Sequence, residues 1–334
     1  MISLTTAIWR FLYTRMAHRK EPPRVELKRS QYQGALLGLA VGDALGAPLK
    51  FRPRGSAPAV KDMTSGGPLH VGRGTWTDDT SMALCLAASL LEKKGFDAID
   101  QLTRYNKWRR EGYLSSIGTC IDLSSTMKIA LDKFESTQAT ECGGTTREWA
   151  DNDVISRLAP IPMFFANRPN DAIELARASA QVTHGAVQAL DAATYMSAII
   201  TGILRGDPKD KVLSDLYNPF GDDWTDYSFC DEIAQVATGS FRADTPHDIT
   251  GDGFVGDTLE AALWAFYRSN DFETGALLAV NLGGDADTTG AVYGQIAGAY
   301  YGVQAIPKRW RDAVVQKDLI IALADRIWIE AQKL

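Results

Sequence analysis

Apolar residues recur at helical spacing along most of this 334-residue chain, and few stretches alternate between apolar and polar positions as a strand would. One apolar stripe, which includes Leu84 and Leu91, stops near Gly95, a residue that commonly ends a helix. The pattern predicts an all-α fold with no domain boundary after Pro23. The predicted helical segments are 31–47, 77–95, 96–140, 171–205, 255–281, 287–302 and 309–333.

Two of these predicted helices carry glycine at every fourth position, which leaves one helix face without side chains. Such a face allows close packing on a neighbouring helix. A further glycine pair, Gly283-Gly284, predicts a tight turn before the second helix, because glycine adopts backbone conformations that other residues avoid. The spaced glycines are Gly34, Gly38, Gly42 and Gly46 in the first helix, and Gly290, Gly294 and Gly298 in the second.

The composition is that of a globular protein, with 45% hydrophobic and 23% charged residues. The four cysteines form no CxxC pair, so we expect free thiols in the cytoplasm and no zinc site. No run of 18 apolar residues occurs, so we expect no transmembrane segment. The net charge of −6 argues against nucleic-acid binding, because a protein that binds the phosphate backbone is usually basic.

Residues 1–30 differ from the rest of the chain and are predicted to form a basic, amphipathic extension to a domain of residues 31–334. They carry seven Lys or Arg and two Glu, a net charge of +5, which leaves −11 for the remainder. Leu4, Ile8 and Phe11 share one helical face, and Pro22-Pro23 ends the helix. Three roles stay open: a helix docked on the domain, a partner-binding arm, and a membrane-surface helix.

Two separate helix starts each carry a threonine and two aspartates. The ordinary interpretation is helix capping, since Thr77 is placed as an N-cap and acidic residues favour the first turn. The alternative is a metal site with oxygen ligands only, which suits Mg²⁺, Mn²⁺ or Ca²⁺. Two such cations would balance four carboxylates and could activate a water for hydrolysis. The six residues are Thr77, Asp78, Asp79, Asp285, Asp287 and Thr288.

Two further features precede Thr77, one within the first glycine-bearing helix and one after it. Asp43 stands among small and apolar residues, and a structural role beside the site is favoured over direct chemistry. Residues 52–75 form a loop rich in Pro, Gly and Ser, which is long enough to be functional.

Four segments together resemble the ADP-ribosylglycohydrolase family: GALLGLAVGDALGAPLKF (34–51), GTWTDDTSMAL (74–84), AQVTHG (180–185) and NLGGDADTTGAVYGQIAGAYYG (281–302). The resemblance implies a compact, orthogonal multi-helix domain that binds two divalent cations, Mg²⁺ or Mn²⁺. It makes the six residues of the two helix starts the metal ligands. It also implies that Asp122 faces the substrate ribose and that His184 lies at the ADP-ribose pocket, with Asp78, Asp287 and Asp122 carrying the catalysis.

Two positions depart from the family pattern. Lys50 stands where the family usually has Glu, and a lysine there could weaken metal binding or remove a base. The alternative is that Lys50 points outward and that another carboxylate, such as Asp122, serves. In the substrate loop Asn152 and Arg157 match the family, but Asp153 replaces a Gly and is expected to crowd and repel a diphosphate.

The resemblance therefore implies a cytoplasmic, metal-dependent hydrolase that removes ADP-ribose from a modified protein, with arginine the favoured acceptor. Two other functions stay open. Some bacterial members of the family are immunity proteins that block an ADP-ribosyltransferase toxin by contact, and residues 1–30 would suit such binding. A non-catalytic protein that binds ADP-ribose is the third, because Lys50 and Asp153 both indicate altered substrate handling.

Overall fold

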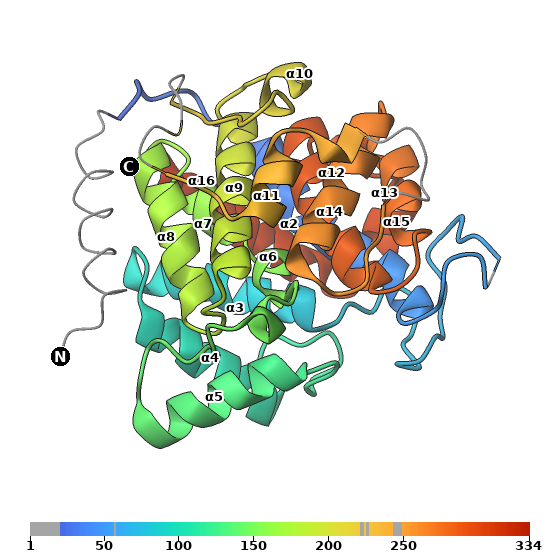
Figure 1. Ribbon diagram of the computed structural model, residues 1–334. Helices are drawn as coiled ribbons and strands as arrows, with labels where there is room; N and C mark the ends of the chain where they lie inside the picture. The colour runs from blue at the N-terminus through green and yellow to red at the C-terminus, as the bar shows by residue number, and fades with distance from the viewer. Residues whose placement is uncertain (1–20, 57, 221–223, 225–226, 243–248) are drawn as a thin grey trace.

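The structure of the protein is a computed structural model, which describes residues 21–56, 58–220, 224, 227–242 and 249–334. At its centre helix α2 (Arg29–Gly46) packs along helix α14 (Ala286–Tyr301), and Figure 1 shows both in the middle of the molecule. Their glycine-bearing faces meet. A Cβ added to Gly38 would lie 2.3 Å from the carbonyl oxygen of Gly294, so only glycine permits this approach.

The other helices surround this pair (Figure 1). Helices α9, α12, α13 and α16 pack directly on it, whereas α4 and α5 lie at one end of the molecule beyond α3. The longer helices are α3 (Asp78–Lys93), α4 (Ala98–Glu111), α5 (Ser125–Thr137), α8 (Pro169–Gln181), α9 (Val187–Leu204), α12 (Val255–Arg268), α13 (Phe272–Val280) and α16 (Lys317–Ala331). The short ones are α6 (Asp153–Ser156), α7 (Pro160–Phe164), α10 (Lys209–Val212), α11 (Asp231–Ala237), α15 (Lys308–Ala313) and four 3₁₀ turns, η1 (Ala47–Leu49), η2 (Arg147–Trp149), η3 (Ser240–Arg242) and η5 (Val303–Ala305).

Within the described residues the chain forms no β-strand and only three isolated β-bridges, so the all-α prediction is confirmed. Most predicted helical segments contain one or two helices. The segment 96–140 is broken by the loop between α4 and α5, because Gly112 ends α4 in the left-handed conformation (φ 67°). That loop carries Asp122, so the interruption supplies a candidate site residue.

The described part of the N-terminal segment, residues 21–28, forms neither helix nor strand and contacts the helical domain. The Val25 amide donates to the Asn167 side chain (3.0 Å), and the Trp328 indole donates to the Leu27 carbonyl (2.8 Å). The next helix begins at Arg29. The predicted amphipathic helix before Pro22 falls largely on residues 1–20, which lie outside the described residues, and the domain division at residue 30 remains a prediction.

Among the described residues one helix, α9, is long and apolar enough to cross a membrane by length and composition alone, with a mean hydropathy of 1.3. However, 89% of this helix is buried inside the protein. Core helices commonly pass the same test, so α9 gives only weak support for a membrane span, and the absence of such a span remains a prediction.

Candidate active site

The two acidic helix starts come together in the fold. Asp285 is the N-cap residue of α14, and the turn before it is possible because Gly283 and Gly284 adopt positive φ (76° and 62°). The Thr288 hydroxyl lies 3.5 Å from a carboxylate oxygen of Asp79, which stands in the first turn of α3. The fold therefore brings the two acidic helix starts together, which their spacing along the sequence could not show.

Asp43 joins α2 to the start of α3. Its carboxylate accepts hydrogen bonds from the backbone amides of Thr77 (3.0 Å) and Thr80 (3.2 Å), and from the hydroxyls of both residues (3.0 and 2.6 Å). Burial raises the pKa of Asp43 to about 6, although the four donors oppose this shift. Thr77 is the N-cap residue, as predicted, but its side chain caps nothing, because its hydroxyl is used on Asp43.

Lys50 points inward, so of the two alternatives left open the outward orientation is wrong and the approach to the acidic cluster is confirmed. Its side-chain nitrogen lies 2.5 Å from Asp122, 2.9 Å from Asp285 and 3.0 Å from Asp287, and the residue is 6% exposed. The local turn is the reason: Phe51 takes a positive φ (60°) and projects into solvent, which leaves Lys50 on the inner side. Burial would lower the pKa of Lys50, but the carboxylates hold it well above its usual value.

Three aspartates at the helix starts carry a buried oxygen with neither a hydrogen-bond partner nor a Lys50 contact among the described residues: Asp78 Oδ1, Asp79 Oδ2 and Asp287 Oδ1. The buried Asp285 Oδ1 also accepts no hydrogen bond from the described part of the chain, but it lies 2.9 Å from the Lys50 ammonium. Burial raises the pKa of the first three carboxyls well above the usual value, and neighbouring carboxylates raise it further. Buried carboxylates are costly unless a cation compensates them. The oxygen-only donors and their unpartnered lone pairs therefore fit a hard divalent cation.

Asp122 lies in the loop between α4 and α5, at the edge of the acidic cluster. It adopts the left-handed conformation (φ 62°), which aspartate tolerates better than most residues. Burial raises the pKa of Asp122 above its usual value, although Lys50 opposes this shift. Its side chain is 13% exposed, so it stands between Lys50 and solvent, where a substrate could reach it.

Asn152 and Asp153 lie on the other side of the cluster. The Asn152 amide donates to Asp285 (2.7 Å) and to the Thr258 hydroxyl (2.9 Å), so it orients the Asp285 carboxylate. Asp153 is buried and accepts a hydrogen bond from the Ser124 hydroxyl (2.5 Å). Burial raises the pKa of Asp153 to about 7. Its expected repulsion of a diphosphate remains a prediction.

His184 and Arg157 are not brought to the cluster as exposed side chains. His184 is fully buried, and its ring nitrogens bond Asp151 (2.5 Å) and the Thr183 hydroxyl (2.8 Å). The Arg157 guanidinium donates to Thr183 and lies 4.8 Å from the centre of the Tyr105 ring. Both therefore support the loop that carries Asn152, and the structure shows neither of them open to a substrate.

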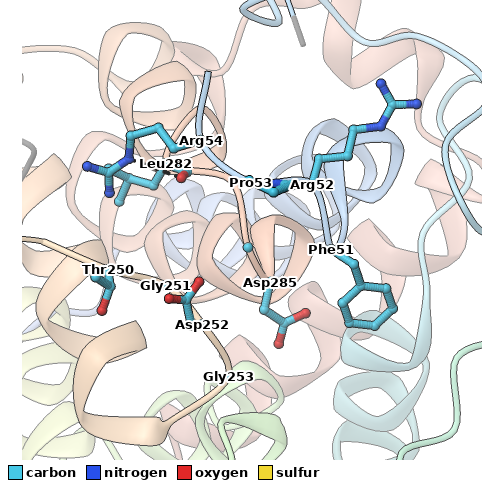
Figure 2. A pocket seen from close by; sticks show the side chains of 11 residues that line it. Phe51, Arg52, Pro53, Arg54, Thr250, Gly251, Asp252, Gly253, Leu282 and Asp285 are labelled. Atoms are coloured by element: carbon cyan, nitrogen blue, oxygen red, sulfur yellow. Dashed lines mark hydrogen bonds between the residues drawn. The ribbon is translucent and has the colours of Figure 1, made fainter. Parts of the chain in front are cut away.

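A cavity of about 680 Å³ opens beside Asp285. Figure 2 shows the Asp285 carboxylate between Asp252 and the ring of Phe51, with Arg52 and Arg54 on the upper side. None of these four neighbours was singled out from the sequence as a site residue. Asp252 could have been identified from the sequence run Thr250-Gly251-Asp252-Gly253, because an aspartate between glycines is typical of a loop that approaches a ligand.

A comparison with known protein families identifies the family of this chain. The family model described as ADP-ribosylglycohydrolase matches residues 24–334, which is nearly the whole chain. The chain belongs to the ADP-ribosylglycohydrolase family. The resemblance inferred from the four motifs is thus confirmed.

Individual members of the ADP-ribosylglycohydrolase family agree with this assignment. The chain is 36% identical over 299 residues to the ADP-ribosylarginine hydrolase Tri1 of Serratia proteamaculans (strain 568), which covers 90% of this chain and 79% of that protein. It is 29% identical over 304 residues to the ADP-ribosyl-(dinitrogen reductase) glycohydrolase of Rhodospirillum rubrum, with 87% and 95% covered. A solved ADP-ribosylglycohydrolase-related protein complex superposes with a TM-score of 0.80 at 42% identity, covering 91% of this chain and 98% of that one.

The ADP-ribosylglycohydrolase fold of this chain is therefore shown, and with it the prediction of a multi-helix domain. The individual metal ligands and substrate contacts remain predictions, although the structure brings Asp78, Asp79, Asp122, Asp285 and Asp287 into one cluster.

Proposed function

We propose that this protein hydrolyses the glycosidic bond between ADP-ribose and a modified arginine side chain, which reverses mono-ADP-ribosylation. The observation that carries the proposal is the buried carboxylate cluster at the joined starts of α3 and α14, beside a cavity of about 680 Å³. The Tri1 relatives named as ADP-ribosylarginine hydrolases, at 36% and 35% identity, support arginine as the acceptor.

The cluster fits a divalent cation, and Mg²⁺ or Mn²⁺ suits its oxygen donors. Asp78, Asp79 and Asp287 would hold it, because each has a buried oxygen with no partner in the described part of the chain. Thr77 and Thr288 offer hydroxyl oxygens beside them. A cation held there would supply Lewis-acid chemistry toward ribose hydroxyls and a water. The resemblance implies two cations, and their number remains a prediction.

The protein groups around the cluster suit the two ends of the substrate. Arg52 lies at the cavity wall, where a guanidinium can bind the diphosphate of ADP-ribose through paired hydrogen bonds. Asp252 lines the same cavity, and its carboxylate suits the guanidinium of the modified arginine. Asp122 has the exposure to accept a hydrogen bond from ribose. Localisation in the cytoplasm, where this protein would encounter its modified protein substrates, remains a prediction.

The test is release of ADP-ribose from a protein ADP-ribosylated on arginine, with Mg²⁺ or Mn²⁺ present. Asp79→Asn and Asp287→Asn should each lower the rate at least 100-fold, because each removes a negative ligand from a buried cation site. Asp210→Asn, a change at an exposed aspartate, is the matched control and should leave the rate unchanged. Undetectable release by the wild type, or full activity in both cluster variants, would refute the proposal.

A second candidate is binding to an ADP-ribosyltransferase toxin through residues 1–30. The family match begins at residue 24, and the segment before it carries most of the basic charge of this extension. Deleting residues 1–20 keeps the contacts of Val25 and Leu27 with the domain. The truncated protein should keep hydrolysis but lose affinity for the toxin in a pull-down assay, and unchanged affinity would reject this role.

A further inference from the structure

Lys50 makes contacts of the kind that a cation would make in the cluster. Its ammonium lies within 3.0 Å of three carboxylates, Asp122, Asp285 and Asp287, which come from a loop, a helix cap and a first helical turn. We propose that this ammonium replaces one of the two divalent cations, so that the protein binds a single one. The inference rests on the cation site of the proposed function but not on hydrolysis.

The carboxylate oxygens divide into two groups. Lys50 takes one oxygen from each of its three partners, and a second cation would have to compete for those same oxygens against a fixed positive charge. The other group consists of Asp78 Oδ1, Asp79 Oδ2 and Asp287 Oδ1, which in the described part of the chain have neither a hydrogen-bond partner nor an ion pair with Lys50. Two of these residues, Asp79 and Asp287, form with Asp43 a buried group whose carboxylate oxygens lie within 4.8 Å of one another, which is close enough to hold one cation.

Asp287 belongs to both groups. Its Oδ2 contacts Lys50 at 3.0 Å, and its Oδ1 is buried and unpartnered among the described residues. The Asp287 carboxylate could therefore bridge two positive charges, one at each oxygen. Lys50 supplies the first, and a divalent cation would supply the second. Asp287 thus connects the ammonium to the remaining cation position.

The backbone around Lys50 is held against α14. The Phe51 amide donates to the Gly284 carbonyl (2.7 Å), and the Gly284 amide donates to the Arg52 carbonyl (2.9 Å). These two bonds fix the residues that follow Lys50 to the turn that carries Asp285. The ammonium can leave the cluster only by rotation of its own side chain, and it would then leave three carboxylates without a cation.

The experiment is a count of Mn²⁺ bound per chain, by equilibrium dialysis and by isothermal titration calorimetry, on the full-length protein. We expect one Mn²⁺ for the wild type and two for Lys50→Glu, which removes the ammonium and adds a ligand. Lys61→Glu makes the same change at an exposed lysine in the following loop and should still bind one. Two Mn²⁺ in the wild type, none in the wild type, or one in Lys50→Glu would each overturn the inference.

A spectroscopic measurement keeps the inference testable if Lys50→Glu does not fold. Electron paramagnetic resonance of the wild type should show isolated Mn²⁺ with its six-line spectrum at every Mn²⁺ concentration. The exchange-coupled spectrum of a close Mn²⁺ pair would overturn the inference. Hydrolysis is measured separately: one bound Mn²⁺ without ADP-ribose release refutes only the proposed function, and two with release refutes only the substitution by Lys50.

Discussion

Replacing Gly42 by Ala tests whether the contact between α2 and α14 builds the site. A Cβ at this position would lie 1.9 Å from the carbonyl oxygen of Gly290 and 2.3 Å from the carbonyl carbon. Ordinary contact begins at 3.4 Å, so the two helices would have to separate by about 1.5 Å at this point. Both partners are backbone atoms of buried helices, so no flexible side chain can yield instead.

The magnitude follows from two opposing effects. Overpacking a well-packed core costs about 1–3 kcal/mol, and a clash with backbone belongs at the upper end of that range. Alanine is favoured over glycine in a helix interior by about 1 kcal/mol. The net expectation is a loss of about 2 kcal/mol in the free energy of unfolding. The same separation would move Asp287 on α14 away from the end of α2, so hydrolysis should fall as well.

The assay is urea unfolding followed by circular dichroism, with ADP-ribose release measured on the same preparations. Gly95→Ala is the control, because a Cβ there has no atom of the described residues within 4 Å, and it should change the stability by no more than about 0.5 kcal/mol. If Gly42→Ala is as stable as the wild type, or if both variants are equally destabilised, the argument from close helix packing fails.

Three further predictions concern buried polar groups. Burial raises the pKa of Asp153 from 3.8 to about 7, so the folded state binds this proton more tightly than the unfolded state and stability falls as the pH rises between these values. In metal-free protein Asp153→Asn should flatten that slope by about 1.4 kcal/mol per pH unit in urea titrations. An unchanged slope would contradict the shift. Asp43→Asn places an amide donor against the donors of Thr77 and Thr80, and the thermal midpoint should fall by the equivalent of about 1–3 kcal/mol; a midpoint equal to that of the wild type would show that Asp43 does not hold α3. Arg157→Met should lower the free energy of unfolding in urea by about 1.5–3 kcal/mol but leave KM unchanged in the folded protein. A large rise in KM would contradict this expectation and support the predicted substrate contact of Arg157.

Much of the candidate site was accessible from the sequence because its signals are local. The two helix starts with paired aspartates, the glycine turn before Asp285 and the glycine repeats all follow from short-range rules of capping, backbone freedom and helical periodicity. These signals located the elements and the acidic residues. The motifs in the same segments carried the resemblance to the family that the whole-chain match confirmed.

The direction of individual side chains was decided only by the tertiary structure. Lys50 and Asp287 are 237 residues apart, and nothing in the spacing shows that their side chains meet. The turn after Pro48 and its backbone bonds to Gly284 direct the ammonium inward. In the same way, only the tertiary structure shows that Arg157 is buried, with its guanidinium over the Tyr105 ring. The sequence by itself determined which helices and acids this protein has, because those depend on neighbours along the chain; which of its charges compensate one another depends on contacts between distant segments, which only the fold creates.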